Sequence, residues 1–313
     1  MEISSKGSAS LFKLLIHGGA GAVRRDHYSN QEISEYKKSL KEVLDFGVEQ
    51  LAHEQSAEDV VVKVVSLLED NPLFNSGRGS VLTSDGRVQM DAAVMCGQDG
   101  SCGAVTLAES IKNPVQMAQW VMRKTPHRLL GGRDVDLLAK AQGFQMEDVD
   151  YFVTEKRREQ LAAAKAKGAI QLDHDSEDHS QTVGAVALDV FGNVAAATST
   201  GGLTNKMPGR VSDSAIVGAG TFADNQSLAF SATGTGDVFI QNMSGFDAHA
   251  LMVYSKKSLS EACDEVLEKV KVRGGRGGVI ALRANGESYM AFNSLGMFRG
   301  QMDSEMKWEV AIF

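Results

Sequence analysis

The feature that most constrains this chain is an abrupt change of composition at Thr182. The stretch before it, 172–181, is polar and rich in charge, whereas a run of small and apolar residues begins at Thr182 itself. Both alternating faces of the run 182–188 are small or apolar, which predicts a strand covered on both sides. A loop therefore meets a buried strand at a single threonine.

The residues after this run predict a hairpin. A turn signal, Asp189-Val-Phe-Gly-Asn193, leads into a second run, 194–202, which ends in Gly-Gly. A hairpin centred near Phe191 places Thr182 opposite Thr200, at the roughly 5 Å that separates directly paired residues. The two hydroxyls then meet at the open end of the hairpin, beside glycines that allow close approach of backbone or ligand. The alternative is a purely structural threonine pair, and a slip of one residue would separate the side chains.

A threonine at such a boundary has a chemical use besides opening a strand. If the peptide bond before it is cut, Thr182 becomes an N-terminus, and its own α-amino group can take the hydroxyl proton. A free α-amino group titrates near pH 8 (about 7.7–8.0), so it can serve as a base at cellular pH. The junction is compatible with an N-terminal nucleophile and with an ordinary β-branched residue at the start of a strand.

Two later segments carry polar groups in predicted loops. In the segment 205–213, Arg210 offers a planar fork to a carboxylate and Asp213 can accept from an ammonium, which suits the two ends of an α-amino acid. A surface Arg–Asp pair is the alternative. In the segment 231–237, Thr233 stands beside glycine N–H groups, an arrangement that fits an oxyanion hole. A glycine-rich helix start is the alternative there.

Short motifs are spread along the chain from about residue 13 to the C-terminus. They are Ile16-His-Gly-Gly-Ala-Gly21, Asn71-Pro-Leu-Phe-Asn-Ser-Gly-Arg-Gly-Ser80, Met90-Asp-Ala92, Asn113-Pro-Val115, Thr125-Pro-His127, Thr182-Val-Gly-Ala-Val-Ala-Leu-Asp189, Ala197-Thr-Ser-Thr-Gly-Gly202, Asn205-Lys-Met-Pro-Gly-Arg210, Gly218-Ala-Gly220, Thr233-Gly-Thr-Gly236 and Phe292-Asn-Ser-Leu-Gly-Met-Phe298. In this order they resemble the plant-type L-asparaginases, also called isoaspartyl peptidases, which are N-terminal nucleophile hydrolases.

The resemblance implies an α/β fold of the αββα sandwich type, whereas periodicity alone predicts α/β with antiparallel hairpins. It also implies self-cleavage between Gln181 and Thr182. The products would be an N-terminal α subunit, 1–181, with a polar linker at about 168–181, and a C-terminal β subunit, 182–313, together one folded unit. Many relatives carry glycine where Gln181 stands, and glutamine is bulkier and less permissive at unusual backbone angles.

The catalytic roles are likewise implied by the resemblance. Thr182 would be the nucleophile, and Thr200 would hydrogen-bond its hydroxyl. Thr233 and Gly234 would form the oxyanion hole and would also contact the substrate. The loop of His17, Gly18 and Gly19 would pack close to the scissile bond.

Substrate and metal binding are implied in the same way. Arg210 and Asp213 would hold the α-carboxylate and α-amino group of the substrate, Gly236 would add backbone contacts, and Asn75 would point toward the nucleophile from the other subunit. A structural sodium, or potassium, would be wrapped by main-chain carbonyls, and no organic cofactor is implied. The carbonyls would be those of Leu68, Glu69, Asn71, Phe74, Ser76 and Arg78.

The expected activity is hydrolysis of L-asparagine and of β-aspartyl dipeptides, with release of L-aspartate. Two alternatives stay open. One is a glycosylasparaginase-like hydrolase, although its relatives carry Asp-Thr-Ile-Gly at the cut and enter the secretory route. The other is an unprocessed, inactive scaffold protein, which Gln181 motivates. The resemblance further implies a dimer of αβ heterodimers.

Composition agrees with an enzyme that acts on small molecules. The chain has 313 residues and a net charge of −8, which argues against nucleic acid or an anionic membrane as its main partner. Its three cysteines are odd in number and lack a metal-binding spacing, which favours free thiols in a reducing compartment. No run reaches transmembrane length and the start lacks a signal-peptide pattern, so we expect a cytoplasmic protein.

The periodicity also predicts the elements outside the hairpin. Helices are expected at 34–55, 57–69, 114–124, 135–142, 155–167, 237–253 and 259–270. Strands are expected at 11–17, 87–95, 103–107, 227–231, 278–284, 287–292 and 308–313.

Overall fold

The computed structural model describes residues 11–166, 179–180 and 182–313, so Gln181 and most of the predicted linker lie outside the described residues. The larger of two sheets has strands from both sides of Thr182. Its path runs β13 (Trp308–Ala311), β12 (Gly296–Asp303), β1 (Lys13–Gly21), β6 (Val183–Leu188), β7 (Val194–Thr200), β2 (Met90–Cys96), β3 (Cys102–Ala108) and β4 (Leu129–Gly131), and β5 (His179–Ser180) pairs with β1 beside this path.

A second sheet is built from residues after Thr182 only. Its order is β11 (Ser288–Phe292), β10 (Gly277–Leu282), β9 (Ala229–Gly234) and β8 (Thr221–Ala223). The helices are α1 (Asn30–Ala52), α2 (Ala57–Glu69), α3 (Pro114–Lys124), α4 (Arg133–Ala141), α5 (Val149–Phe152), α6 (Glu155–Ala166), α7 (Gly236–Asn242), α8 (Ser244–Val253) and α9 (Leu259–Val272), with 3-10 turns η1 (Arg25–His27) and η2 (Asp213–Ala215).

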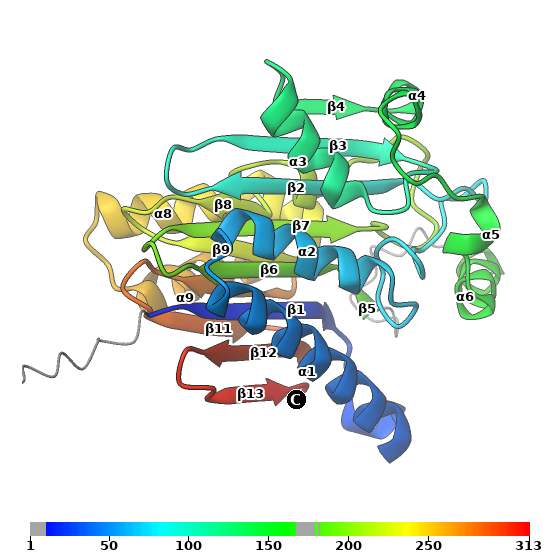
Figure 1. Cartoon of the computed structure of the whole chain (residues 1–313). Helices are drawn as coiled ribbons and strands as arrows, with labels where there is room; N and C mark the ends of the chain where they lie inside the picture. The colour runs from blue at the N-terminus through cyan, green and yellow to red at the C-terminus, as the bar shows by residue number, and fades with distance from the viewer. Residues whose placement is uncertain (1–10, 167–178, 181) are drawn as a thin grey trace, which may run out of the picture.

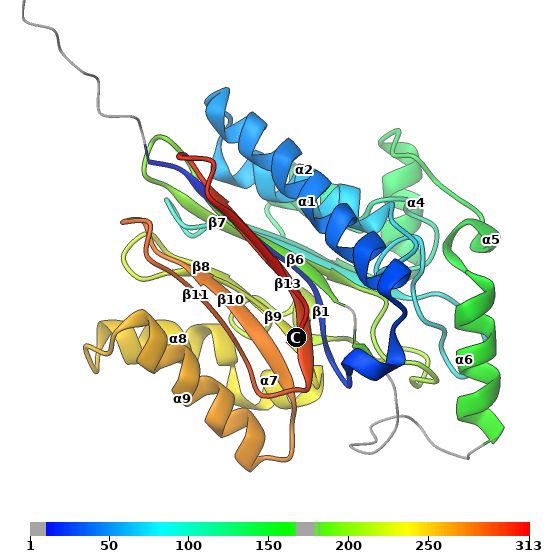
Figure 2. The same ribbon diagram turned by 90° about the horizontal axis from the view of Figure 1, so that it is seen from below.

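The elements stack in layers. Figure 2 shows α1 and α2 on the outer face of the larger sheet, the smaller sheet against its inner face, and α8 and α9 beyond the smaller sheet. Two buried clusters correspond to this order, one beneath α1, α2 and α3 and one that includes residues between the sheets and beneath α7, α8 and α9. The predicted α/β class with antiparallel hairpins is confirmed, because every pairing of neighbouring strands is antiparallel except that of β3 with β4.

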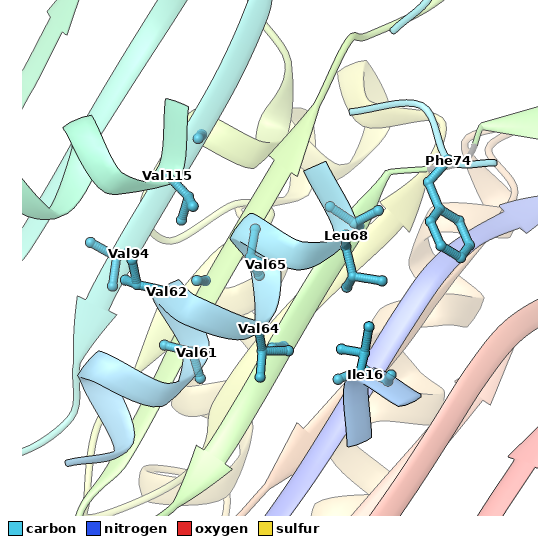
Figure 3. Packing of buried hydrophobic residues seen from close by; sticks show 14 of the residues in the cluster. Ile16, Val61, Val62, Val64, Val65, Leu68, Phe74, Val94 and Val115 are labelled. Atoms are coloured by element: carbon cyan, nitrogen blue, oxygen red, sulfur yellow. The ribbon is translucent and has the colours of Figure 1, made fainter. Parts of the chain in front are cut away.

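The packing of α2 explains its sequence. Four valines and a leucine of this helix point between the sheet and the neighbouring helices, where they meet Ile16 of β1 and Val94 of β2 (Figure 3). Full burial of such a side chain stabilises the fold by about 1.5–3 kcal/mol. The strands β6 and β7 are rich in alanine, whose short side chains allow this helix to pack close to the sheet.

The hairpin has the predicted register. Val183 pairs with Ser199 and Leu188 with Val194, so Thr182 continues the ladder opposite Thr200. Both faces of β6 are buried, as expected for a strand between two layers. Figure 1 shows this hairpin in the middle of the larger sheet, with β1 on one side and β2 on the other.

Local capping sets several helix boundaries. The helix α1 begins at Asn30, four residues before the predicted start, because Ser29 and Glu32 form a reciprocal capping box there. The same device, from Ser258 and Glu261, starts α9. The helices α2 and α3 have the predicted bounds.

One predicted element is wrong, and β4, β5, β8, β12 and α5 were not predicted. The single helix expected at 237–253 is two helices, because Met243 between them adopts a left-handed conformation with φ 47°. The bend lets the N–H groups of Gly245 and Phe246 donate to carbonyls of the 218–219 loop, a tertiary contact that periodicity does not report. The strand β12 was not predicted at all, although it lies between β1 and β13. Among the described residues, no helix combines the length and the apolar character of a membrane span.

Candidate active site

The site is built around Thr182 at the start of β6. Its hydroxyl donates to Thr200 Oγ1 over 3.1 Å, and the N–H of Gly202 donates to the same oxygen over 3.0 Å. Both threonines are buried, with exposed fractions of 5% and 1%. The hydroxyl pairing expected from the hairpin register is therefore present, and the end of the hairpin fixes it from both strands.

A buried histidine holds the main chain of Thr182. His17 of β1 lies 2.9 Å from the Thr182 carbonyl through Nδ1 and 2.8 Å from Ser231 Oγ through Nε2. A carbonyl can only accept, so Nδ1 carries the proton, and Nε2 must accept from the Ser231 hydroxyl. Thr198 Oγ1, 2.7 Å from Ser231 Oγ, then completes the chain as a donor. Burial lowers the pKa of His17 to about 3, so the ring is neutral.

Glycine is required at position 184 by this arrangement. A Cβ on Gly184 would lie 2.1 Å from Ser231 Oγ and 2.4 Å from His17 Nε2. The missing side chain makes room for the hydrogen bond that crosses between the two sheets. Thr182, the predicted nucleophile, and the groups that hold it thus occupy one end of the space between the larger and the smaller sheet.

The predicted oxyanion residues lie at the end of β9, two residues beyond Ser231. Alternate residues of a strand share a face, so Thr233 points the same way as Ser231, toward the larger sheet. Its Oγ1 accepts from the N–H of Ala20 over 3.2 Å. Ala20 also pairs with Ser180, so the segment before the predicted cut runs beside the same part of β1. Gly234 has φ 137° and no room for a Cβ, which would lie 2.2 Å from the Arg276 carbonyl.

Arg210 and Asp213 come together over Gly236. A Cβ on that glycine would lie 2.3 Å from Asp213 Oδ1 and 3.0 Å from Arg210 Nη2. Arg210 does not form the surface pair with Asp213 considered above, because its Nη2 donates to Asp237 Oδ2 over 2.7 Å. Burial raises the pKa of Asp213 to about 7, against the opposing effect of Arg210.

Two polar atoms of this pair lack partners. Within the described part of the chain, Arg210 Nε and Asp213 Oδ2 are buried without a hydrogen bond. Unsatisfied buried groups of this kind cost about 1–3 kcal/mol each, and more when they are charged. A ligand that brings both a carboxylate and an ammonium would satisfy them.

Three residues that the sequence reading did not single out fix the loop that carries Arg210. Asp91 of β2 accepts from the N–H of Ser212, and Gln89 accepts from the N–H of Gly209. Lys206 is buried and donates from Nζ to the Gln89 carbonyl. Burial lowers the pKa of Lys206 to about 8, Asp91 opposes the shift and Arg210 adds to it. Asp91 and Lys206 both lie in the motifs quoted above, and that position is the sequence signal that could have identified them.

Asn75 lies against the end of the hairpin in its own chain, where Val81 also donates to its side chain, so the expectation that it points toward the nucleophile of the other subunit is wrong. Its Nδ2 donates to the Gly202 carbonyl over 2.7 Å, and its main-chain oxygen accepts from the N–H of Gly201. Behind it, on the helix-covered face of the sheet, Ser199 Oγ donates to Glu69 Oε1 over 2.6 Å. Burial raises the pKa of Glu69 to about 8, partly offset by this hydrogen bond. Asn75, in the loop after α2, and Glu69, the last residue of α2, therefore hold the residues on either side of Thr200.

The loop predicted to hold sodium contains several main-chain carbonyls of the kind that a hard cation needs. The Glu69 carbonyl accepts one N–H, from Arg78, and the Asn71 carbonyl accepts one, from Phe74, whereas the Leu68 carbonyl accepts from both Asp70 and Asn71. A carbonyl oxygen has a second lone pair for a cation. A Cβ on Gly79, whose φ is 100°, would lie 2.6 Å from the Phe74 carbonyl and 2.7 Å from that of Pro72, so main-chain oxygens converge there. All-oxygen surroundings suit a hard cation.

Comparison with known proteins gives the family of this chain. The family model described as asparaginase matches residues 10–312. The chain belongs to the asparaginase family. The motifs that carried the resemblance are thus parts of a match that extends over nearly the whole chain.

Members of this family with curated names are similar over most of their length. An isoaspartyl peptidase of Salmonella typhimurium is 47% identical over 292 residues, with 91% of this chain and 93% of the relative covered. An isoaspartyl peptidase/L-asparaginase of Rattus norvegicus is 38% identical, with 91% and 84% covered. A plant-type L-asparaginase of Pyrobaculum calidifontis is 38% identical, with 92% and 95% covered.

Proposed function

We propose that this asparaginase-family chain cuts itself before Thr182 and then hydrolyses the side-chain amide of L-asparagine and the β-linkage of β-aspartyl dipeptides, releasing L-aspartate. The observation that carries the proposal is the presence of three features in one chain. The buried Thr182 hydroxyl is hydrogen-bonded to Thr200, the Thr182 carbonyl is hydrogen-bonded to His17, and Arg210 Nε and Asp213 Oδ2 have no hydrogen-bond partner among the described residues. The names of the relatives point to the same two substrate classes.

In maturation, the Thr182 hydroxyl attacks the carbonyl carbon of Gln181. The C–N bond breaks, the nitrogen leaves with a proton as the new α-amino group, and water hydrolyses the resulting ester. Thr200 accepts from the attacking hydroxyl, which orients the oxygen lone pairs for this step. The strand β5 on Ala20 and the His17 contact hold the chain on either side of the bond. After the cut, strands from both parts remain paired in the larger sheet.

In turnover, the new α-amino group takes the Thr182 proton as the oxygen attacks the β-carbonyl of the substrate. Ammonia or an amino acid leaves with that proton, and water then releases aspartate from the acyl-enzyme. The Thr233 hydroxyl and Gly234 would donate to the oxyanion of both tetrahedral intermediates. Each such donor typically lowers the barrier by a few kcal/mol, about 2.7–4.

The aspartyl end of the substrate is recognised by charge. Its α-carboxylate pairs with Arg210 and its ammonium with Asp213, while Gly236 leaves the space between them. Thr233, Gly234 and Asn75 line the path from this pair to the nucleophile in the proposed arrangement. Asparagine and the β-aspartyl dipeptides share this end and differ only in the group that leaves.

The remaining expectations are parts of the same proposal. The four layers correspond to an αββα sandwich of the N-terminal nucleophile hydrolase type. The carbonyls of Leu68, Glu69, Asn71, Phe74, Ser76 and Arg78 would hold a sodium ion, with potassium as the alternative. Such an ion would fix the loop that carries Asn75, and it takes no part in bond making. The processed units would pair by two-fold symmetry.

The test combines mass spectrometry with assays. The wild-type chain should yield a fragment that starts at Thr182, and aspartate should be released from asparagine and from a β-aspartyl dipeptide. Thr182→Ala should stay folded, uncut and inactive. Normal cleavage of Thr182→Ala would refute the nucleophile, an intact wild-type band over days would favour the scaffold alternative, and turnover of N-glycosyl-asparagine alone would favour the glycosylasparaginase alternative.

A further inference from the structure

A cavity adjoins the site and is not used by the chemistry above. Its volume is about 470 Å³, within the range of small-molecule pockets, roughly 300–1,000 Å³. It is lined by Leu203, Lys206, Met207, Arg210, Thr235, Asp237, Val238, Gln241, Arg273 and Gly274. Ammonia, the leaving group from asparagine, needs none of this space.

The walls of the cavity continue the two strand ends that flank the nucleophile. Leu203 follows Gly202, whose N–H donates to Thr200, and Lys206 Nζ would lie 2.7 Å from a Cβ on Gly202. On the other side Thr235 follows Gly234, which we assigned to the oxyanion hole. The cavity is therefore bordered by the residues that directly follow Gly202 and Gly234 in the chain, and it shares Arg210 with the aspartyl site.

The lining combines an apolar wall with an excess of positive charge. Leu203, Met207 and Val238 supply the apolar surface, and Lys206, Arg210 and Arg273 are cationic. Asp237 is the lining residue with a negative charge, and it is already paired with Arg210. Arg273, at the exposed end of α9, forms no ion pair with any described residue. The surface suits a molecule with an apolar body and a free carboxylate.

We propose that this cavity is the subsite for the leaving residue of a β-aspartyl dipeptide, and that it selects dipeptides whose second residue is apolar and has a free carboxylate. The apolar side chain packs against Leu203, Met207 and Val238, and the carboxylate meets the charge of Arg273. This inference rests on the proposed function and adds the identity of the leaving group. It makes Arg273 a specificity-determining residue for peptides and gives it no role toward asparagine.

The experiment compares three substrates that share the aspartyl end: asparagine, β-aspartyl-leucine and the C-terminal amide of β-aspartyl-leucine. In the processed wild-type protein, the free acid should have a KM lower than that of the amide. Arg273→Gln should raise the KM of the free acid by about two- to fivefold, as expected for an exposed ion pair, and bring it near that of the amide. The KM for asparagine should not change.

The matched control is Arg276→Gln, which removes the same charge three residues away, from a side chain that does not line the cavity. It should leave all three KM values unchanged. Met207→Ala, at an exposed position, should raise the KM of β-aspartyl-leucine by about two- to fourfold without affecting β-aspartyl-glycine.

Equal KM values for acid and amide in the wild type, or equal effects of both arginine variants, would overturn the subsite while leaving the proposed function intact. Failure of the wild type to hydrolyse any of the three substrates would instead overturn the proposed function.

Discussion

Replacing Ser231 with alanine removes the hydroxyl that joins the two sheets behind the nucleophile. Ser231 donates to His17 Nε2, and the other nitrogen of that ring donates to the Thr182 carbonyl. In Ser231→Ala the His17 ring stays in position, because Nδ1 still donates to the Thr182 carbonyl. Its Nε2, however, loses the hydroxyl that donates to it. The Thr198 hydroxyl contacts Ser231 Oγ and the Gly220 carbonyl and reaches His17 only through Ser231, so it does not replace the lost donor.

The magnitude follows from burial. His17 is completely buried, so water cannot replace the lost donor, and an unsatisfied buried acceptor costs about 1–3 kcal/mol. In a chain of this size each kcal/mol lowers the melting temperature by roughly 2–4 °C, which gives a fall of about 2–12 °C. Self-cleavage should also slow, because the main chain of Thr182 is then less firmly held.

The stability measurement belongs in a Thr182→Ala background, so that every molecule is the same uncut chain. Ser80→Ala is the matched control, because Ser80 Oγ is also fully buried but has no hydrogen-bond partner among the described residues. It should be neutral or slightly stabilising. A decrease in melting temperature for Ser231→Ala that is no larger than the decrease for Ser80→Ala would refute the reasoning. So would an NMR spectrum of the parent that places the His17 proton on Nε2.

Three further predictions concern charge and space in the site. Because Asp213 must be ionised to bind an ammonium and its pKa is raised to about 7, kcat/KM for asparagine should carry a titration near pH 7 that kcat lacks, since bound substrate lowers that pKa. Protonation of the Thr182 α-amino group should lower both quantities. Gly236→Ala should spare self-cleavage and raise the KM of asparagine at least tenfold, on the order of 1.4 kcal/mol, because the new Cβ would overlap Asp213 Oδ1. An unchanged KM would contradict the placement of the substrate between Arg210 and Asp213. Glu69 has a folded-state pKa near 8, above its unfolded value, so its protonated form favours folding and the melting temperature should fall from pH 5 to pH 8. Glu69→Gln should flatten this dependence of melting temperature on pH. Equal slopes in the two proteins would count against the role of Glu69.

Much of the site could be predicted from local patterns. The apolar runs on both sides of the turn near Phe191 set the hairpin register, because a slip by one residue would exchange the two covered faces. That register alone brings Thr182 and Thr200 together, as the structure confirms. The approximate bounds of α2 and α3 also followed from periodicity, since their apolar positions recur at helical spacing.

Other features depended on residues far apart in the chain. The contact of His17 with Thr182 and Ser231 links three strands, and no spacing rule relates positions separated by 165 and 214 residues. The helix break at Met243 arises from hydrogen bonds to the 218–219 loop, and β12 is defined by the strands on either side of it. Local propensities do not include such long-range hydrogen bonds and strand pairings.

The sequence by itself determined that a threonine opens a buried strand with a second threonine across from it, because side-chain alternation in a strand has a fixed period of two. Only the tertiary structure decided that His17 is neutral, that Arg210 pairs with Asp237, and that Asp213 retains an unsatisfied oxygen. These outcomes depend on how much water each group loses and which charges surround it, and both are set by the packing of one sheet against the other.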